Sequence, residues 1–167
     1  LSFVILILNL LCFEFAFSKN SIVVKVGDKI VTSYEVENEI KTILFLNKRP
    51  LNQESINKTK DLAIKELIRT SIKKIEIEKY NVTNYNSKDL DNYLVNLSKI
   101  LDVKNSSLNK KFNQNSINYE ILLEKVKTDL IWNSLIFAIY KNQISINAIE
   151  VENEITLKAK QASEKKE

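Results

Sequence analysis

Glycine and proline are almost missing from this chain, and their scarcity limits the folds that it can form. The 167 residues contain one glycine, Gly27, and one proline, Pro50. A fold built on tight hairpins or β-bulges normally needs more glycine than this, whereas long helices do not. Hydrophobic residues make up 44% of the chain, which is enough for a real core. The composition therefore predicts a mainly α protein.

Apolar residues recur at helical spacing in five to six segments that are separated by polar breaks. A capping box at Thr32-Ser33-Tyr34-Glu35 predicts the start of a helix that ends near Asn47. Ser87 is expected to cap the third helix. The further helices are expected at 53–80, 87–101, 108–114 and 118–142, with a last one from residue 147. In the longest clean helix the expected apolar stripe is Leu62, Leu67, Ile68, Ile72 and Ile75.

Two short segments favour strands instead. β-branched runs flank Gly27-Asp28 within residues 21–31, which predicts a hairpin. Ile144-Ser145-Ile146 alternates and could add a small strand. Two strands alone are marginally stable, so we expect them to pack on the helices.

Residues 1–17 are nearly all apolar and predict a secretion signal. The run is too short to cross a bilayer comfortably, and Asn9 and Glu14 interrupt it. Ala16 and Ser18 are small residues at the positions that signal peptidase requires, which predicts a cut between Ser18 and Lys19. We therefore expect a Sec-type signal peptide at 1–18 and a periplasmic protein. No basic residue precedes Lys19, as a signal peptide would normally have, and an uncleaved membrane anchor is the alternative.

The missing residue types narrow the chemistry. The chain has no histidine, and its one cysteine, Cys12, lies in the leader. A chain that begins at Lys19 cannot form a disulfide, a thiolate nucleophile, a Ser-His pair or a His/Cys zinc site. No catalytic residue, cofactor or metal site is predicted, although a carboxylate-only Mg²⁺ or Ca²⁺ site stays open. The net charge is +4, but lysines alternate with acidic residues, which indicates solvated helix faces and argues against nucleic-acid binding.

The order of these segments resembles the N-terminal domain of SurA-type periplasmic chaperones, over roughly residues 21–157. The similar pieces are the strand pair within 23–31, the step at 32–36, the helix segment 61–68, and the segments 144–146 and 149–152. The resemblance implies a helical domain whose small strands pair segments near the two ends of the mature chain. It also implies an apolar crevice that binds extended outer-membrane polypeptides. Residues 158–167 are then a polar tail or the start of a linker.

The expected function is therefore that of an ATP-independent holdase whose partners are unfolded outer-membrane or secreted polypeptides. Transient contact with a membrane surface is also expected from the basic charge. Apolar residues that break their helix's stripe are the candidate client contacts: Phe45, Leu46, Phe112, Phe137 and Tyr140. One alternative is the N-terminal part of a parvulin-type prolyl isomerase, whose catalytic domain would follow residue 167. Another is a membrane-tethered structural or interaction domain.

Overall fold

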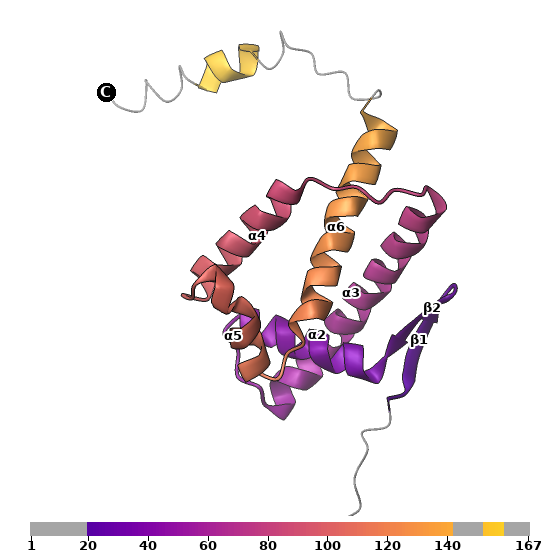
Figure 1. Cartoon of the computed structure of the whole chain (residues 1–167), viewed down its shortest axis with the longest axis vertical. Helices are drawn as coiled ribbons and strands as arrows, with labels where there is room; N and C mark the ends of the chain where they lie inside the picture. The colour runs from indigo at the N-terminus through magenta and orange to yellow at the C-terminus, as the bar shows by residue number, and fades with distance from the viewer. Residues whose placement is uncertain (1–19, 142–151, 159–167) are drawn as a thin grey trace, which may run out of the picture.

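A computed structural model describes residues 20–141 and 152–158, and its fold is mainly helical with a small antiparallel sheet, as predicted. Its elements are β1 (Ile22–Val26), β2 (Lys29–Thr32), α2 (Ser33–Leu46), α3 (Gln53–Lys79), α4 (Ser87–Ile100), the 3-10 helix η1 (Asn105–Ser107), α5 (Leu108–Gln114) and α6 (Tyr119–Tyr140). Residues 152–158 form a further helical segment. Figure 1 shows α3 and α6 side by side, with α2 across one end of the pair. None of the helices in these residues is long and apolar enough to cross a membrane.

The predicted hairpin is formed by β1 and β2, and the single glycine closes it. Val24 pairs with Val31, and the register is irregular between Ile22 and Val24. Gly27 has φ +60°, and a Cβ atom there would lie 3.0 Å from Cδ1 of Ile75 in α3. The glycine therefore stands where the turn and the close approach to α3 both require it. The strand expected at 144–146 lies outside the described residues.

Side-chain caps begin most of the helices. The predicted capping box of α2 is confirmed: the backbone N–H of Glu35 donates to Thr32 Oγ1 (3.2 Å), and that of Thr32 donates to Glu35 Oε2 (2.8 Å). For α4 the predicted cap is wrong by one residue. Asn86 Oδ1, not Ser87, accepts from the Lys88 N–H at 3.1 Å. Asparagine and serine are equally good N-cap residues, so the sequence did not show which of the neighbours Asn86 and Ser87 caps the helix.

The predicted core stripe of α3 is wrong in part. Leu67 is buried, but Leu62 and Ile72 are 47% and 48% exposed. The buried face is set by residues spaced four apart: Thr59, Ala63, Leu67 and Ser71. Three of these four have small side chains, which let α2 and α6 approach the α3 backbone closely. The spacing of large apolar residues does not reveal a face of this kind.

The core consists of two clusters that meet along α2. The hairpin cluster joins β2, α2 and α3, and consists of Val31, Val36, Ile40, Leu44, Ala63 and Leu67. The Phe112 cluster joins α4, α5 and α6, and consists of Leu97, Leu108, Phe112, Ile117, Tyr119, Leu122 and Val126. Phe45 and Leu46, at the end of α2, pack against the second cluster. Helix α2 therefore connects the two halves of the core.

Four helices end in a left-handed residue that is not glycine. These residues are Lys48, Asn81, Asp102 and Ser116, with φ values of 52° to 54°. The residue that follows each of them donates its backbone N–H to the carbonyl five residues before itself, for example Arg49 N–H to Leu44 O at 2.9 Å. This is the Schellman geometry, which ordinarily places glycine at the left-handed position. Asparagine and aspartate adopt this conformation more readily than other residues, so the strain is greatest at Lys48 and Ser116.

We predict that Lys48→Gly stabilises the protein by about 0.5–1 kcal/mol. Relief of the left-handed strain exceeds the extra entropy that glycine gives the unfolded chain. Urea denaturation followed by far-UV circular dichroism measures the change. Lys65→Gly, in the middle of α3, is the control and should destabilise by about 1 kcal/mol. A loss of stability in Lys48→Gly would contradict this account of the helix ends.

Candidate functional site

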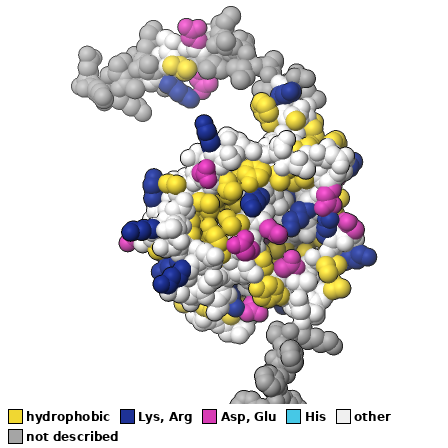
Figure 2. All heavy atoms as spheres, in the orientation of Figure 1, with side chains coloured by type: hydrophobic (Ala, Val, Ile, Leu, Met, Phe, Trp, Pro, Cys, Tyr) yellow, Lys and Arg dark blue, Asp and Glu magenta, His cyan; other side chains and the backbone are white. Residues whose placement is uncertain are grey.

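A groove of about 460 Å³ lies where α2, α4 and α6 come together. Its apolar walls are Ile43 and Leu46 of α2, Tyr93 of α4, and Leu122, Val126 and Leu130 of α6. Figure 2 shows apolar side chains gathered over the α4 and α6 part of this face, with charged side chains beside them. We call this the α4–α6 groove. An open, mainly apolar concavity with a few polar groups is the usual form of a binding site.

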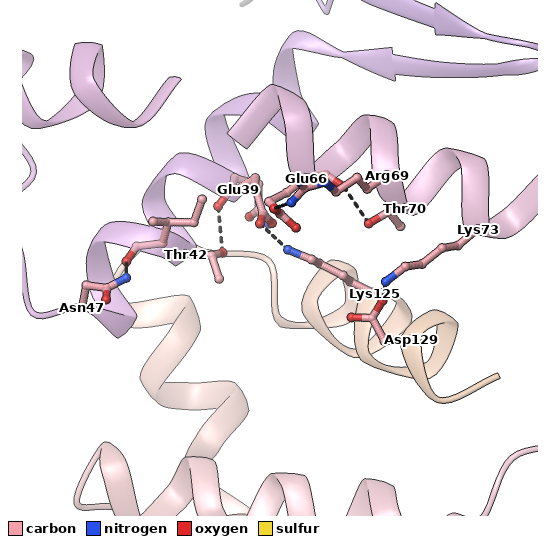
Figure 3. A network of polar contacts seen from close by, with 11 residues as sticks. Glu39, Thr42, Asn47, Glu66, Arg69, Thr70, Lys73, Lys125 and Asp129 are labelled. Atoms are coloured by element: carbon pink, nitrogen blue, oxygen red, sulfur yellow. Dashed lines mark hydrogen bonds and ion pairs between the residues drawn. The ribbon is translucent and has the colours of Figure 1, made fainter. Parts of the chain in front are cut away.

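One side of the groove is made of ion pairs between α6 and its neighbours (Figure 3). Lys125 Nζ binds Glu39 Oε1, and the Glu39 side chain is only 4% exposed. Lys73 Nζ lies 2.6 Å from Asp129 Oδ1 and joins α3 to α6. These pairs neutralise Glu39 and Asp129, two of the carboxylates that line the groove. Since both pairs cross between helices, they also fix the position of α6 relative to α2 and α3.

Tyr93 is the polar group on the α4 side of the groove. Burial raises the pKa of its phenol above the ordinary value of 10, and the nearby charge of Asp129 raises it further. The phenol is therefore protonated at neutral pH and can donate a hydrogen bond. A donor beside apolar walls suits the carbonyl of an extended main chain.

The predicted client residues separate into buried and exposed groups. Phe112 is fully buried, with its ring centroid 5.2 Å from that of Phe45 and 5.4 Å from that of Tyr119. The prediction that Phe112 contacts clients is therefore wrong for this fold. The polar residues of α5 face solvent, and Phe112 enters the core as the anchor of that short helix. Phe45 is partly buried against it, and Leu46 lines the α4–α6 groove.

Phe137 and Tyr140 lie elsewhere. They are 66% and 46% exposed near the end of α6, and neither lines the groove. The structure therefore does not bring the five predicted residues together. The predicted cleavage site at Ser18 and Lys19 lies outside the described residues.

Tyr93 and Leu130 are groove residues that the sequence did not single out. Both belong to helical segments that were predicted. The sequence therefore indicated the two helices, but not that these two side chains line one groove. Which stripes face each other across a gap depends on the packing of α2 and α5, and helical periodicity carries no information on that.

The described residues form further hollows, and two of them involve the β-hairpin. One, of about 500 Å³, lies between β1, α2 and the start of α3, with apolar walls that include Val36, Ile40 and Leu51. The other, of about 310 Å³, lies between β2, α3 and α6 and has several charged walls, including Lys29 and Glu124. The hydrogen bond that Lys29 Nζ donates to the Glu78 carboxylate raises the pKa of Lys29, so this amine is charged at neutral pH. In the described part of the chain, no group of histidine, cysteine or acidic residues could hold a metal ion.

Comparisons of this chain with protein-family models, with curated proteins and with solved structures found no match.

We predict that Phe112 and Phe137 differ sharply in how much their side chains contribute to the stability of the protein. Phe112→Ala should cost about 3–5 kcal/mol because it leaves a cavity in the core. Phe137→Ala, at an exposed position, should change stability by less than about 0.5 kcal/mol. Urea denaturation measures both. If Phe112→Ala does not fold, Phe112→Leu should still show a smaller loss, and equal effects at both positions would contradict the placement of Phe112.

We also predict a large effect from breaking the buried ion pair. Lys125→Met leaves the Glu39 carboxylate buried without a partner and should cost about 3–5 kcal/mol. The double variant Glu39→Gln/Lys125→Met should recover much of that loss, because no uncompensated charge remains. Lys74→Met is the matched control, since its partner Glu124 lies 3.8 Å away and is largely exposed. Additive effects in the double variant would contradict the pairing.

Proposed function

We propose that this domain is an ATP-independent holdase that binds unfolded outer-membrane or other envelope polypeptides in the α4–α6 groove. The observation that carries the proposal is the groove itself: apolar walls from three helices, left open beside a wall of charged pairs. Its volume of about 460 Å³ suits a few client side chains, not a folded partner. The sequence resemblance to SurA-type chaperones supports the same class of function.

A holdase of this kind needs no chemistry. Each buried apolar client side chain contributes up to about 1.5–3 kcal/mol, and the cost of ordering client and groove offsets much of that. A groove that holds only a few side chains therefore gives affinities near micromolar, or about −8 kcal/mol. Such complexes dissociate without an energy source, and an ATP-independent holdase must release its client in this way. Binding the unfolded form also lowers its free concentration, and aggregation slows as a result.

Polar groups around the groove suit an extended client. Tyr93 offers a protonated phenol, and Asn47 lies at the edge. Hydrogen bonds to the client main chain add little selectivity for side chains, because every residue has the same main-chain groups. This combination favours broad binding of apolar segments over recognition of one sequence.

The proposed location is the periplasm, on the basis of the apolar leader and its cleavage signal at Ser18 and Lys19. As part of a longer protein, the groove would present clients to a parvulin-type domain. The binding step is the same in both settings, so one experiment tests it.

We predict that the protein suppresses aggregation of a β-barrel outer-membrane protein diluted from urea, and that Leu130→Asn weakens this suppression. Leu130 lies in the groove wall, and a polar amide there removes apolar contact with the client. Light scattering at increasing molar ratios of chaperone to client measures the effect.

Leu62→Asn is the matched control, since Leu62 is 47% exposed on α3 and lies outside the groove. Circular dichroism verifies that both variants fold. No suppression by the wild-type protein would count against the holdase function. Equal suppression by the two variants would show that clients bind elsewhere.

A further inference from the structure

The last turns of α6 have an apolar surface that the rest of the described chain does not cover. Phe137 is 66% exposed, Ile139 39% and Tyr140 46%. Figure 1 shows this end of α6 extending beyond α3 and α4. From residue 130 to residue 140 the helix contains only two polar residues, Asn133 and Ser134. A helix that is apolar on all sides requires an apolar environment around its whole circumference.

The single charge at this end of α6 is positive. No acidic residue occurs between Asp129 and Glu150, and Lys141 follows the exposed aromatic residues directly. The chain as a whole has a net charge of +4. An anionic partner therefore meets no repelling carboxylate on this part of the helix and is attracted by the lysine.

The shape of this end distinguishes between kinds of partner. An extended polypeptide is held by a concave surface, and none of the three hollows described above includes residues 136–141. A lipid bilayer, in contrast, can surround a projecting helix end on every side. Aromatic residues beside lysine are also the composition that suits the boundary between lipid tails and headgroups.

We propose that the end of α6 docks on the surface of an anionic lipid bilayer. Phe137, Ile139 and Tyr140 enter the interface, and Lys141 lies at the level of the phosphate groups. The contact is peripheral, because none of the described helices can span a membrane. It would hold the α4–α6 groove near the membrane, and it gives Phe137 and Tyr140 a role other than client binding.

The test is binding of the full chain to vesicles of phosphatidylcholine alone or mixed with phosphatidylglycerol. The only tryptophan, Trp132, lies five residues before Phe137 and serves as a local probe. We expect flotation with the anionic vesicles, a blue shift of Trp132 emission, and quenching by brominated lipid. Phe137→Ser/Tyr140→Ser should lower the partition coefficient at least about tenfold, because two apolar side chains no longer enter the interface.

Val95→Ser/Ile100→Ser is the matched control, since these residues are 40% and 58% exposed on α4. This variant should bind like wild type. Residues 1–19 are present in all variants, so lipid binding by that apolar segment is common to them. Lys141→Glu should weaken binding to anionic vesicles only, and Lys110→Glu on α5 should not.

Several results would overturn the proposal. One is undiminished vesicle binding by Phe137→Ser/Tyr140→Ser, and another is equal binding of the wild type to neutral and anionic vesicles. Loss of client protection with unchanged vesicle binding would assign this end to polypeptides. Loss of a dimer with unchanged vesicle binding would assign it to a second copy of the chain. Failure of the vesicle experiment leaves the groove and its holdase test unaffected, because the two surfaces share no residue.

Discussion

Helix α2 is the element on which the rest of the fold depends, because it supplies both halves of the core and positions α6. Val36, Ile40 and Leu44 enter the hairpin cluster, while Phe45 and Leu46 turn to the Phe112 cluster. In the first half of the same helix, Asn38 Oδ1 accepts from the backbone N–H of residue 118 at 2.7 Å, and Glu39 binds Lys125. Within the described residues the buried Nδ2 of Asn38 has no partner. An unpaired buried amide of this kind destabilises the fold by about 1–3 kcal/mol. That loss accompanies the hydrogen bond by which the same side chain holds the start of α6 on α2.

The parts of the fold that follow from local chemistry were predictable from the sequence. The capping box at Thr32, the turn at Gly27 and the ends of the helices each depend on a few neighbouring residues. The inner face of α3 was not predictable in the same way. Its close contacts use Thr59, Ala63 and Ser71, and small residues give no apolar period. Leu62 and Ile72 belong to the expected stripe but lie outside the packed face, because the partner helices lie on the other side.

The candidate site is less predictable still, because it is a gap between helices. Phe112 and Phe137 were both predicted from the sequence as aromatic client contacts. The structure separates them completely: Phe112 is fully buried, and Phe137 is 66% exposed. The difference arises from the lengths of the two helices that carry these residues. The short α5 folds back onto α6, whereas α6 continues for 22 residues and its end extends past its neighbours.

The charged side of the groove explains how apolar walls remain open instead of closing on each other. Drawing α4 fully across the groove would bury Asp129 and Lys73, which are 41% and 30% exposed in their ion pair. Removing such a pair from water costs more than most apolar contacts return, unless every charge gains a new partner. The same pairs join α6 to α2 and α3, whereas among the described residues no ion pair joins α4 to α6. For the proposed holdase, a wall without such pairs would suit client segments of different shape.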